Sequence, residues 1–412
     1  MRSDSPVRNA TGWWSDRRFL KRFVTDLVAG ELSRLRPGWV PAADNAWEDA
    51  FRIDLDLGAD SLEMMQLATA LSQALHLHVA GIEDYLLRRK TIGDWIDTAS
   101  DGLDHFAADL TFMTSGSTGQ PKSCRHSMSS LLQETSVQGT FFKGKSRLLF
   151  AVPSHHIYGF IFTILLPQHL GIGAEAMLDL RRRVPSTLSG IVLPGDLVVG
   201  YPEFWGAAAR GSAQYREDVT GVTSTAPCAA DICDRLIDAG MAALVQVYGS
   251  SETAGVGWRT DPRGSYELYP FWRADATGTD RLMRTDSEGD VTRVLAPDQF
   301  EWVDDRHFSV GKRHDAAVQV GGLNVFPAHV AGILRQHHHV ADAAVRLMRP
   351  DEGNRLKAYL VLDPSVENSE SALEEVRRWV DATLPVAQRP KAFTVGPALP
   401  TTVAGKAADW AA

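Results

Sequence analysis

The segment 114–122 reads TSGSTGQPK and has the composition of an anion-binding loop. It follows the apolar run 110–113, and a Gly/Ser/Thr loop that leaves a strand presents backbone N–H groups and hydroxyls to an anion. Lys122 adds a positive charge. A Walker A loop would need glycine at position 121, where the chain has Pro121. The segment therefore predicts a polyphosphate site of another class. The expected phosphate contacts are Thr114, Ser115, Gly116, Ser117, Thr118, Gly119 and Lys122.

Three further motifs follow downstream in a fixed order. They read YGSSET at 248–253, GKRHDAAVQVGGLNVFP at 311–327 and LPTTVAGK at 399–406. Together with 114–122 they resemble the ordered motifs of adenylate-forming enzymes, which include acyl- and aryl-CoA synthetases, AMP-dependent ligases and peptide-synthetase adenylation domains. The sequence is identified as a member of this superfamily by that resemblance. It implies an AMP-forming acid–thiol ligase that uses ATP and Mg²⁺.

The resemblance also assigns roles to residues of these motifs. It implies that Lys406 is the catalytic lysine and that Arg313 holds the ribose and phosphate. It implies that Tyr248 stacks on adenine, with Gly249 beside it, that Ser251 contacts phosphate, and that Glu252 takes part in catalysis as the ligand of Mg²⁺. Asp315 would be the hinge about which a small C-terminal domain rotates between the two half-reactions.

Weaker matches extend the predicted site. STAP at 224–227 stands where the family has an adenine loop, so Ala226 and Pro227 are expected beside the nucleotide. Asp298, before Arg313, stands where an aspartate grips the ribose hydroxyls. PSHHIYG at 153–159 resembles an element beside the acyl pocket, which implies a substrate-side role for His156 and Tyr158.

The chemistry of adenylation explains these residue types. A carboxylate becomes an acyl-AMP by in-line attack on the α-phosphate of ATP, and pyrophosphate leaves. Both reactants are anions, so the site must neutralise charge as the transition state forms. Lys406 is suited to bridge the carboxylate and the α-phosphate, and Mg²⁺ on Glu252 would offset phosphate charge.

The first hundred residues carry a second signal. Residues 55–62 read LDLGADSL, and helix-like apolar spacing follows them. The pattern resembles an acyl carrier protein, in which a serine at a helix start carries 4′-phosphopantetheine. Ser61 would then be the attachment site, Asp60 would cap the helix, and a phosphopantetheinyl transferase would be a partner. The alternative is a small helical bundle in which Ser61 stays unmodified.

These motifs predict a multidomain fold. An N-terminal helical carrier-protein-like bundle would cover 1–100, followed by a polar linker at 100–104. A truncated α/β adenylating large domain would cover 108–314, and a mobile, small α+β C-terminal domain 315–412. Strands are expected at 147–152, 196–200 and 243–247 of the large domain. In the small domain we expect strands at 342–345 and 358–362 and a helix at 371–383.

The short large domain resembles that of compact ligases for hydroxybenzoate-type acids in aryl polyene and xanthomonadin-type pathways. An aryl acid is therefore expected rather than a fatty acid. The acceptor thiol could belong to an acyl carrier protein, which the carrier-like segment favours, or to CoA. A third reading is an inactive adenylation scaffold that carries an acyl carrier domain.

Composition and residue patterns bear on other functions that the protein could have. The net charge of −9 argues against nucleic-acid binding, and no apolar run is long enough for a transmembrane segment. Three cysteines without metal spacing suggest a reducing cytoplasm. The run 337–339, three histidines, could bind a metal but is expected in a loop or at the start of a strand of the small domain. A homodimer is left open.

Overall fold

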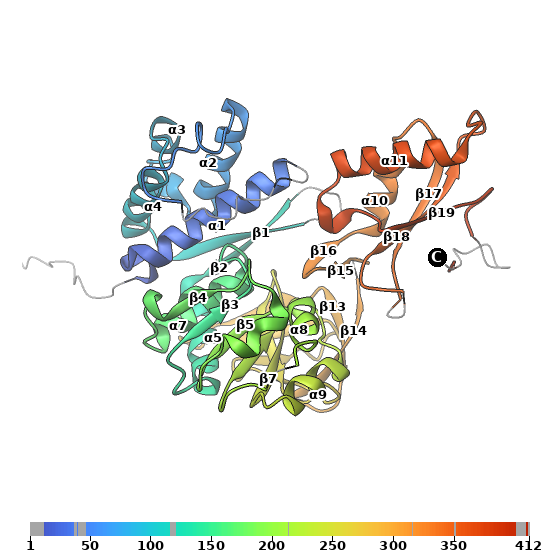
Figure 1. Ribbon diagram of the computed structural model, residues 1–412. Coiled ribbons are helices and arrows are strands. Elements are labelled where there is room, and N and C mark those ends of the chain that lie inside the picture. The colour runs from blue at the N-terminus through green and yellow to red at the C-terminus, as the bar shows by residue number, and fades with distance from the viewer. Residues whose placement is uncertain are drawn as a thin grey trace, which may run out of the picture.

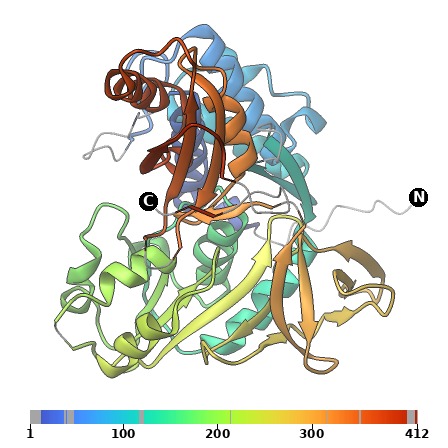
Figure 2. The same ribbon diagram turned by 90° about the vertical axis from the view of Figure 1, so that its right-hand side faces the viewer.

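The structure, a computed structural model, has three parts (Figure 1). It describes residues 12–36, 39, 47–115, 121–212, 214–314, 316–349, 352–400 and 409–410, with only the backbone at 114, 115 and 121. A helical bundle and a small domain lie side by side on the same side of a larger α/β domain, as the turned view in Figure 2 confirms. The boundaries that the sequence predicts for these parts stay predictions.

In the part of the N-terminal segment that the structure describes, the main elements are α-helices. They are α1 (Arg17–Leu35), α2 (Ser61–Leu75), α3 (Tyr85–Arg88) and α4 (Ile92–His105). The Asp60 side chain accepts the N–H groups of Leu62 and Glu63, and the Glu63 carboxylate accepts the N–H of Asp60, which forms a capping box. The predicted cap is therefore confirmed. The predicted linker at 100–104 is wrong, because α4 continues to His105 and buries Leu103 on its apolar face.

A nine-stranded mixed sheet organises the large domain, in the order β13-β14-β9-β8-β7-β6-β5-β3-β4. Its strands β4, β3, β5, β6 and β7 run parallel, and the other pairs are antiparallel. The strands are β3 (Leu148–Phe150), β4 (Met177–Asp179), β5 (Leu197–Gly200), β6 (Thr220–Thr223), β7 (Ala243–Ser250), β8 (Ala254–Arg259), β9 (Tyr266–Leu268), β13 (Asp298–Trp302) and β14 (His307–Arg313). The three predicted strands of this domain correspond to β3, β5 and β7.

Two smaller β-structures and several helices complete this domain. The hairpin of β1 (Asp109–Ser115) and β2 (Pro121–Ser127) carries the loop 116–120 at its tip, outside the described residues. A three-stranded sheet contains β10 (Trp272–Ala274), β11 (Arg281–Thr285) and β12 (Val291–Leu295). The helices are α5 (Met128–Phe141), α6 (Ile157–Phe160), a π-helical turn (Ile161–Leu165), α7 (Leu166–His169), α8 (Pro202–Ala208) and α9 (Ala230–Asp238).

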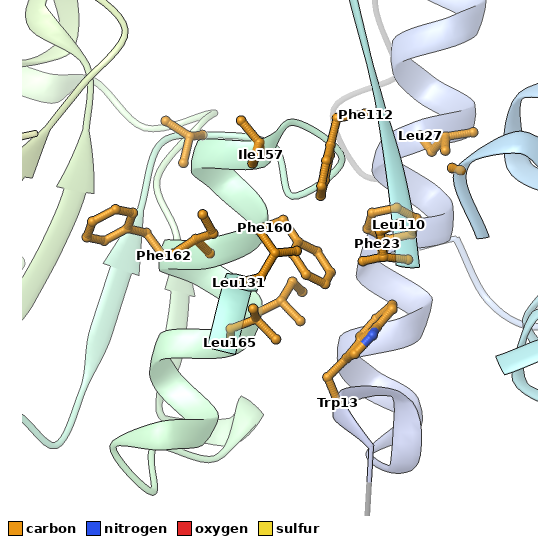
Figure 3. Close-up of a cluster of buried hydrophobic side chains, with 14 of the residues drawn as sticks. Trp13, Phe23, Leu27, Leu110, Phe112, Leu131, Ile157, Phe160, Phe162 and Leu165 are labelled. Carbon is orange, nitrogen blue, oxygen red and sulfur yellow. The ribbon is translucent and has the colours of Figure 1, made fainter. Parts of the chain in front are cut away.

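The bundle and the large domain share one hydrophobic core. Figure 3 shows that Trp13 and Phe23 of the N-terminal segment face Phe160 of the large domain, with Phe112 of β1 beside them. Trp13 and Phe160 meet edge to face, with ring centroids 5.0 Å apart. This core makes α1 a structural part of the large domain as well as of the bundle.

The small domain has a core of its own. It contains the hairpin β15 (Val318–Val320) and β16 (Leu323–Val325), α10 (Pro327–Leu334), α11 (Ser369–Thr383) and a sheet of β17 (Val340–Leu347), β18 (Leu356–Leu362) and β19 (Ala392–Val395). Its predicted strands and helix match β17, β18 and α11. Among the described helices of the whole chain, none combines the length and apolarity needed to cross a membrane.

Candidate active site

Tyr248, Asp298 and Arg313 meet on one side of the large sheet. Tyr248 lies near the end of β7, and its hydroxyl donates to Asp298 Oδ2 at 2.7 Å. Asp298 starts β13 directly opposite Arg313 of β14, whose guanidinium lies 3.9 Å from the same carboxylate oxygen. Burial, together with the neighbouring Asp298 charge, raises the pKa of Tyr248 well above its usual value. The three residues therefore combine an aromatic face, an anionic acceptor and a fixed cation.

Lys122 and Glu252 form the second group of predicted residues. Lys122 is the second residue of β2, close after residues 116–120, and its Nζ is 2.9 Å from Glu252 Oε1. Burial opposes ionisation of Glu252, but the bond from Lys122 and local hydrogen bonds leave its pKa below the usual value. An ionised, partly exposed carboxylate is a fitting ligand for a hard cation such as Mg²⁺. Glu252 lies only four residues along the chain from Tyr248, so the short segment 248–252 connects the two groups.

A half-buried histidine and a buried glutamate, neither of them predicted from the sequence, support that segment. His126 Nε2 lies 2.7 Å from the carbonyl oxygen of Ser251, and Glu134 of α5 accepts the N–H of Gly255 at 2.9 Å. Burial lowers the pKa of His126 and raises the pKa of Glu134 to about 7. Neither residue belongs to a recognisable motif. The one sequence signal is a glutamate placed among the core-facing positions of α5.

The loop 224–227 follows β6 and meets the small domain. Thr225 has a left-handed backbone with φ +78°, and the tip of the β15–β16 hairpin lies against it. A Cβ on Gly322 would lie 3.0 Å from Thr225 Oγ1, and the N–H of Gly321 donates to Glu203 Oε1 of α8 at 3.1 Å. Of the predicted nucleotide contacts, Ala226 is half-buried and Pro227 is exposed beside this junction.

The predicted substrate-side residues lie on a segment that α1 holds in place. Asp26 of α1 accepts both the N–H and the hydroxyl of Ser154 at 2.7 Å, and Arg181 donates to it at 2.5 Å. His156 follows two residues later and precedes α6, and burial lowers its pKa. The Tyr158 hydroxyl donates to the carbonyl oxygen of Gly200 at 2.9 Å.

Ser61 is the first residue of α2 and is exposed, as are Leu62 and Met65 after it. Arg36, at the end of α1, donates to both Glu63 carboxylate oxygens at 2.5 and 2.6 Å and fixes this turn. The remaining predicted residues lie outside the side chains that the structure describes. They are Thr114 and Ser115, seen as the backbone end of β1, and Gly116, Ser117, Thr118, Gly119, Asp315 and Lys406.

Two family matches define the class of the protein. Residues 104–289 match the family described as AMP-binding enzyme, and residues 329–406 match the C-terminal domain of the same enzymes. The 4-coumarate--CoA ligase of Halorhodospira halophila is 35% identical over 388 residues, which cover 93% of this chain and 97% of the relative. The chain therefore belongs to the AMP-binding enzyme family, within its AMP-forming acid–CoA ligases.

Other comparisons agree with this assignment. The 4-coumarate--CoA ligase of Cereibacter sphaeroides is 35% identical over 420 residues, covering 96% of this chain and 97% of the relative. The solved structure of the amide bond synthetase McbA from Marinactinospora thermotolerans is 18% identical with a TM-score of 0.59, covering 94% of this chain and 92% of that one. The latter likeness concerns the fold alone.

Proposed function

We propose that the protein activates an aromatic carboxylic acid with ATP and transfers the acyl group to the thiol of CoA. The observation that carries this proposal is the juxtaposition of an adenosine-side group, Tyr248, Asp298 and Arg313, with a phosphate-side pair, Lys122 and Glu252. The relatives named 4-coumarate--CoA ligase support a hydroxybenzoate- or 4-coumarate-like acid and CoA as the acceptor.

In the first half-reaction, a carboxylate oxygen of the acid attacks the α-phosphorus of ATP. The bond from that phosphorus to the bridging oxygen breaks, and pyrophosphate leaves. Lys122 and the loop 114–119 would hold the leaving phosphates, while Lys406 would bridge the carboxylate and the α-phosphate. Mg²⁺ at Glu252 would supply further charge neutralisation. Asp298 and Arg313 would fix the ribose, which keeps the α-phosphorus in line with the attacking oxygen.

In the second half-reaction, the thiol sulfur attacks the acyl carbon, the thiol proton is lost, and AMP leaves. The hairpin tip at Gly321 and Gly322 already touches Thr225 and Glu203. This contact supports the expectation that the hairpin lines the approach of the thiol after rotation about Asp315. His156 and Tyr158 would lie on the substrate side of the same site.

An exchange assay tests the first half-reaction. Purified protein with ATP and Mg²⁺ is given labelled pyrophosphate and a panel of benzoic, 4-hydroxybenzoic, 4-coumaric and fatty acids. We expect an aromatic acid to support the fastest exchange, and CoA then to yield its thioester. The proposal fails if none of the acids supports exchange above the Asp298→Ala variant, and the aryl preference fails if a fatty acid is best.

A carrier role for the N-terminal bundle is the second candidate. The specific observation in its favour is Ser61, which is exposed at a capped helix start beside the exposed Leu62 and Met65. In this reading a phosphopantetheinyl transferase modifies Ser61, and the protein loads its own arm or a separate acyl carrier protein. Because the bundle and the large domain share one core, the attachment point of such an arm would stay fixed relative to the large domain.

Mass spectrometry distinguishes the two acceptors. After co-expression with a phosphopantetheinyl transferase, the carrier role requires a mass increment that disappears in Ser61→Ala. If no increment forms and CoA alone accepts the acyl group, the bundle is a structural element of a CoA ligase. If Ser61→Ala lowers CoA-independent loading but spares pyrophosphate exchange, the carrier role stands.

A further inference from the structure

The turn between α10 and β17 contains three consecutive histidines. Two of them, His338 and His339, lie close to the carboxylate of Glu375 on α11. His338 is exposed, His339 is half-buried, and Glu375 comes from the middle of α11. His339 Nε2 lies 3.0 Å from Glu375 Oε2. One ligand atom from each of the three side chains lies within 4.8 Å of the other two. The fold therefore gathers two imidazoles and one carboxylate from two separate elements.

We propose that His338, His339 and Glu375 bind one zinc ion. Imidazole nitrogen and carboxylate oxygen are ligands that Zn²⁺ accepts together, whereas Mg²⁺ and Ca²⁺ favour oxygen alone. Three protein ligands leave a fourth tetrahedral position for water. This site is separate from the predicted Mg²⁺ ligand Glu252 of the large domain and goes beyond the proposed ligase activity.

The backbone around the two histidines is fixed before any ion binds. The N–H of His337 donates to the carbonyl oxygen of Leu334 at the end of α10, and the N–H of Val340 donates to that of His337. The N–H of Asp363, after β18, donates to the carbonyl oxygen of His339 at 2.9 Å. These bonds tie the turn to a helix and to a strand, which reduces the ordering that an ion would have to impose.

Glu375 and His337 are also held in position by their surroundings. Glu375 precedes Val376, which is fully buried in the core of the small domain, so the helix presents the carboxylate from a fixed base. His337 stabilises the turn. Its Nδ1 accepts the N–H of His339 at 3.2 Å, and its ring packs edge to face against Trp379. His337 thus orients the pair without being a ligand.

The simpler reading is an ion pair between a protonated His339 and Glu375. The two readings differ in what the site binds. An ion pair needs no metal, whereas the proposed site takes up one equivalent of Zn²⁺. Because all three ligands belong to the small domain, an ion there would link the α10–β17 turn to α11 and stabilise that domain by mass action.

Zinc titration of the full chain, purified without an affinity tag and stripped with a chelator, tests the proposal. Competition with a chromogenic zinc indicator should show one equivalent bound. Glu375→Gln should weaken binding about tenfold or more, as should His338→Ala. The matched control is Glu374→Gln, which changes the adjacent, exposed carboxylate of α11 and should bind zinc as the wild type does.

Cobalt substitution gives an independent readout. Co²⁺ in a tetrahedral site should give an intense visible d–d absorption in the wild type and in Glu374→Gln, and this absorption should be lost in Glu375→Gln. Zinc binding unchanged by Glu375→Gln would show that the histidine run binds ions by itself and would overturn the proposal. Absence of one-equivalent binding in the wild type would also overturn it. Pyrophosphate exchange, measured in parallel, reports on the ligase activity separately.

Discussion

At the scale of residues, the charged groups expected to face ATP are paired with one another. Lys122 contacts Glu252, and Asp298 contacts Tyr248 and Arg313. These pairs orient the side chains, and incoming phosphates or ribose hydroxyls can exchange for existing partners. Preorganised charge of this kind lowers the reorganisation needed in the transition state.

Lys406 is the residue on which adenylation should depend most. Lys406→Ala should slow acid-dependent pyrophosphate exchange by roughly a thousandfold, because the developing charge on the α-phosphate loses its cation. Circular dichroism and thermal melting should show an intact fold. The matched control is Lys391→Ala, an exposed lysine of the same domain, which should keep full exchange. Near-normal exchange in Lys406→Ala would show that another group does the chemistry.

Glu134 should make stability depend on pH. Its pKa rises from 4.5 to about 7 because it is buried, so the folded state retains a proton that the unfolded state releases between these values. Folding stability should therefore fall as the pH rises through this range, by roughly 3 kcal/mol in full. Urea unfolding from pH 5 to pH 8 should show that Glu134→Gln, relative to the wild type, gains stability as the pH rises.

The exposed Glu301 offers a control for this pH dependence. Glu301→Gln should follow the wild-type curve. If Glu134→Gln also runs parallel to the wild type at every pH, the buried carboxyl does not take up the proton, and the support of Gly255 comes from a permanently ionised group.

At the scale of elements, α1 packs against the large domain and forms hydrogen bonds with it. Its Asp26 is 5% exposed and binds Ser154 and Arg181, while its Arg22 donates to the carbonyl and hydroxyl of Thr163. These bonds hold the segment that carries His156. A helix of the N-terminal bundle thus positions a predicted substrate-side residue of another part of the chain.

Asp26→Ala should destabilise the protein by about 2–3 kcal/mol, because it leaves the buried N–H and hydroxyl of Ser154 without their acceptor and leaves Arg181 paired with Asp179 alone. Chemical unfolding measures this loss. Where the variant stays folded at low temperature, KM for the acid should rise more than KM for ATP. The matched control is Glu175→Ala, which removes an exposed ion pair with Arg18 of the same helix and should cost less than about 1 kcal/mol.

At the scale of the whole molecule, the contact between the small domain and the loop 224–227 should matter for only one half-reaction. Gly322→Ala places a Cβ 3.0 Å from Thr225 Oγ1, whereas Gly321→Ala meets open space at a similar backbone conformation, φ +60° against +77°. Thioester formation should fall about tenfold in Gly322→Ala, since misplacing the hairpin displaces the thiol. Pyrophosphate exchange should stay near the wild-type rate.

Gly321→Ala separates backbone strain from contact. An equal loss of thioester formation in both variants would assign the effect to strain in the turn. Equal loss of both half-reactions in Gly322→Ala would contradict a hairpin that serves the second step alone. Asp315→Pro, at the predicted hinge, should likewise spare exchange and stop thioester formation if the small domain rotates there.

The sequence predicted the parts of this molecule that local rules govern. Asp60 caps α2 as expected, and the apolar runs of β5 and β7 form parallel strands on either side of β6 in a buried sheet. The order of the family's motifs predicted that Tyr248, Asp298 and Arg313 share one site. In the structure, these residues of β7, β13 and β14 lie in contact. The support from His126, Glu134 and Asp26 was not predictable, since each contact joins residues far apart in sequence and depends on tertiary packing. The polar run 100–104 was wrongly predicted to be a linker. It forms part of the last turns of α4, which have one exposed and one buried face.

The core that α1 shares with β1 and α6 has a consequence for how the chain unfolds. Because no boundary in that core separates residues 13–103 from residues 110–308, the bundle and the large domain should melt in one cooperative transition. The small domain, with a core of its own, should be able to melt separately. Hydrogen exchange should therefore give α1 and the central strands a common opening free energy, and the first hundred residues should not be transferable as a module to another protein.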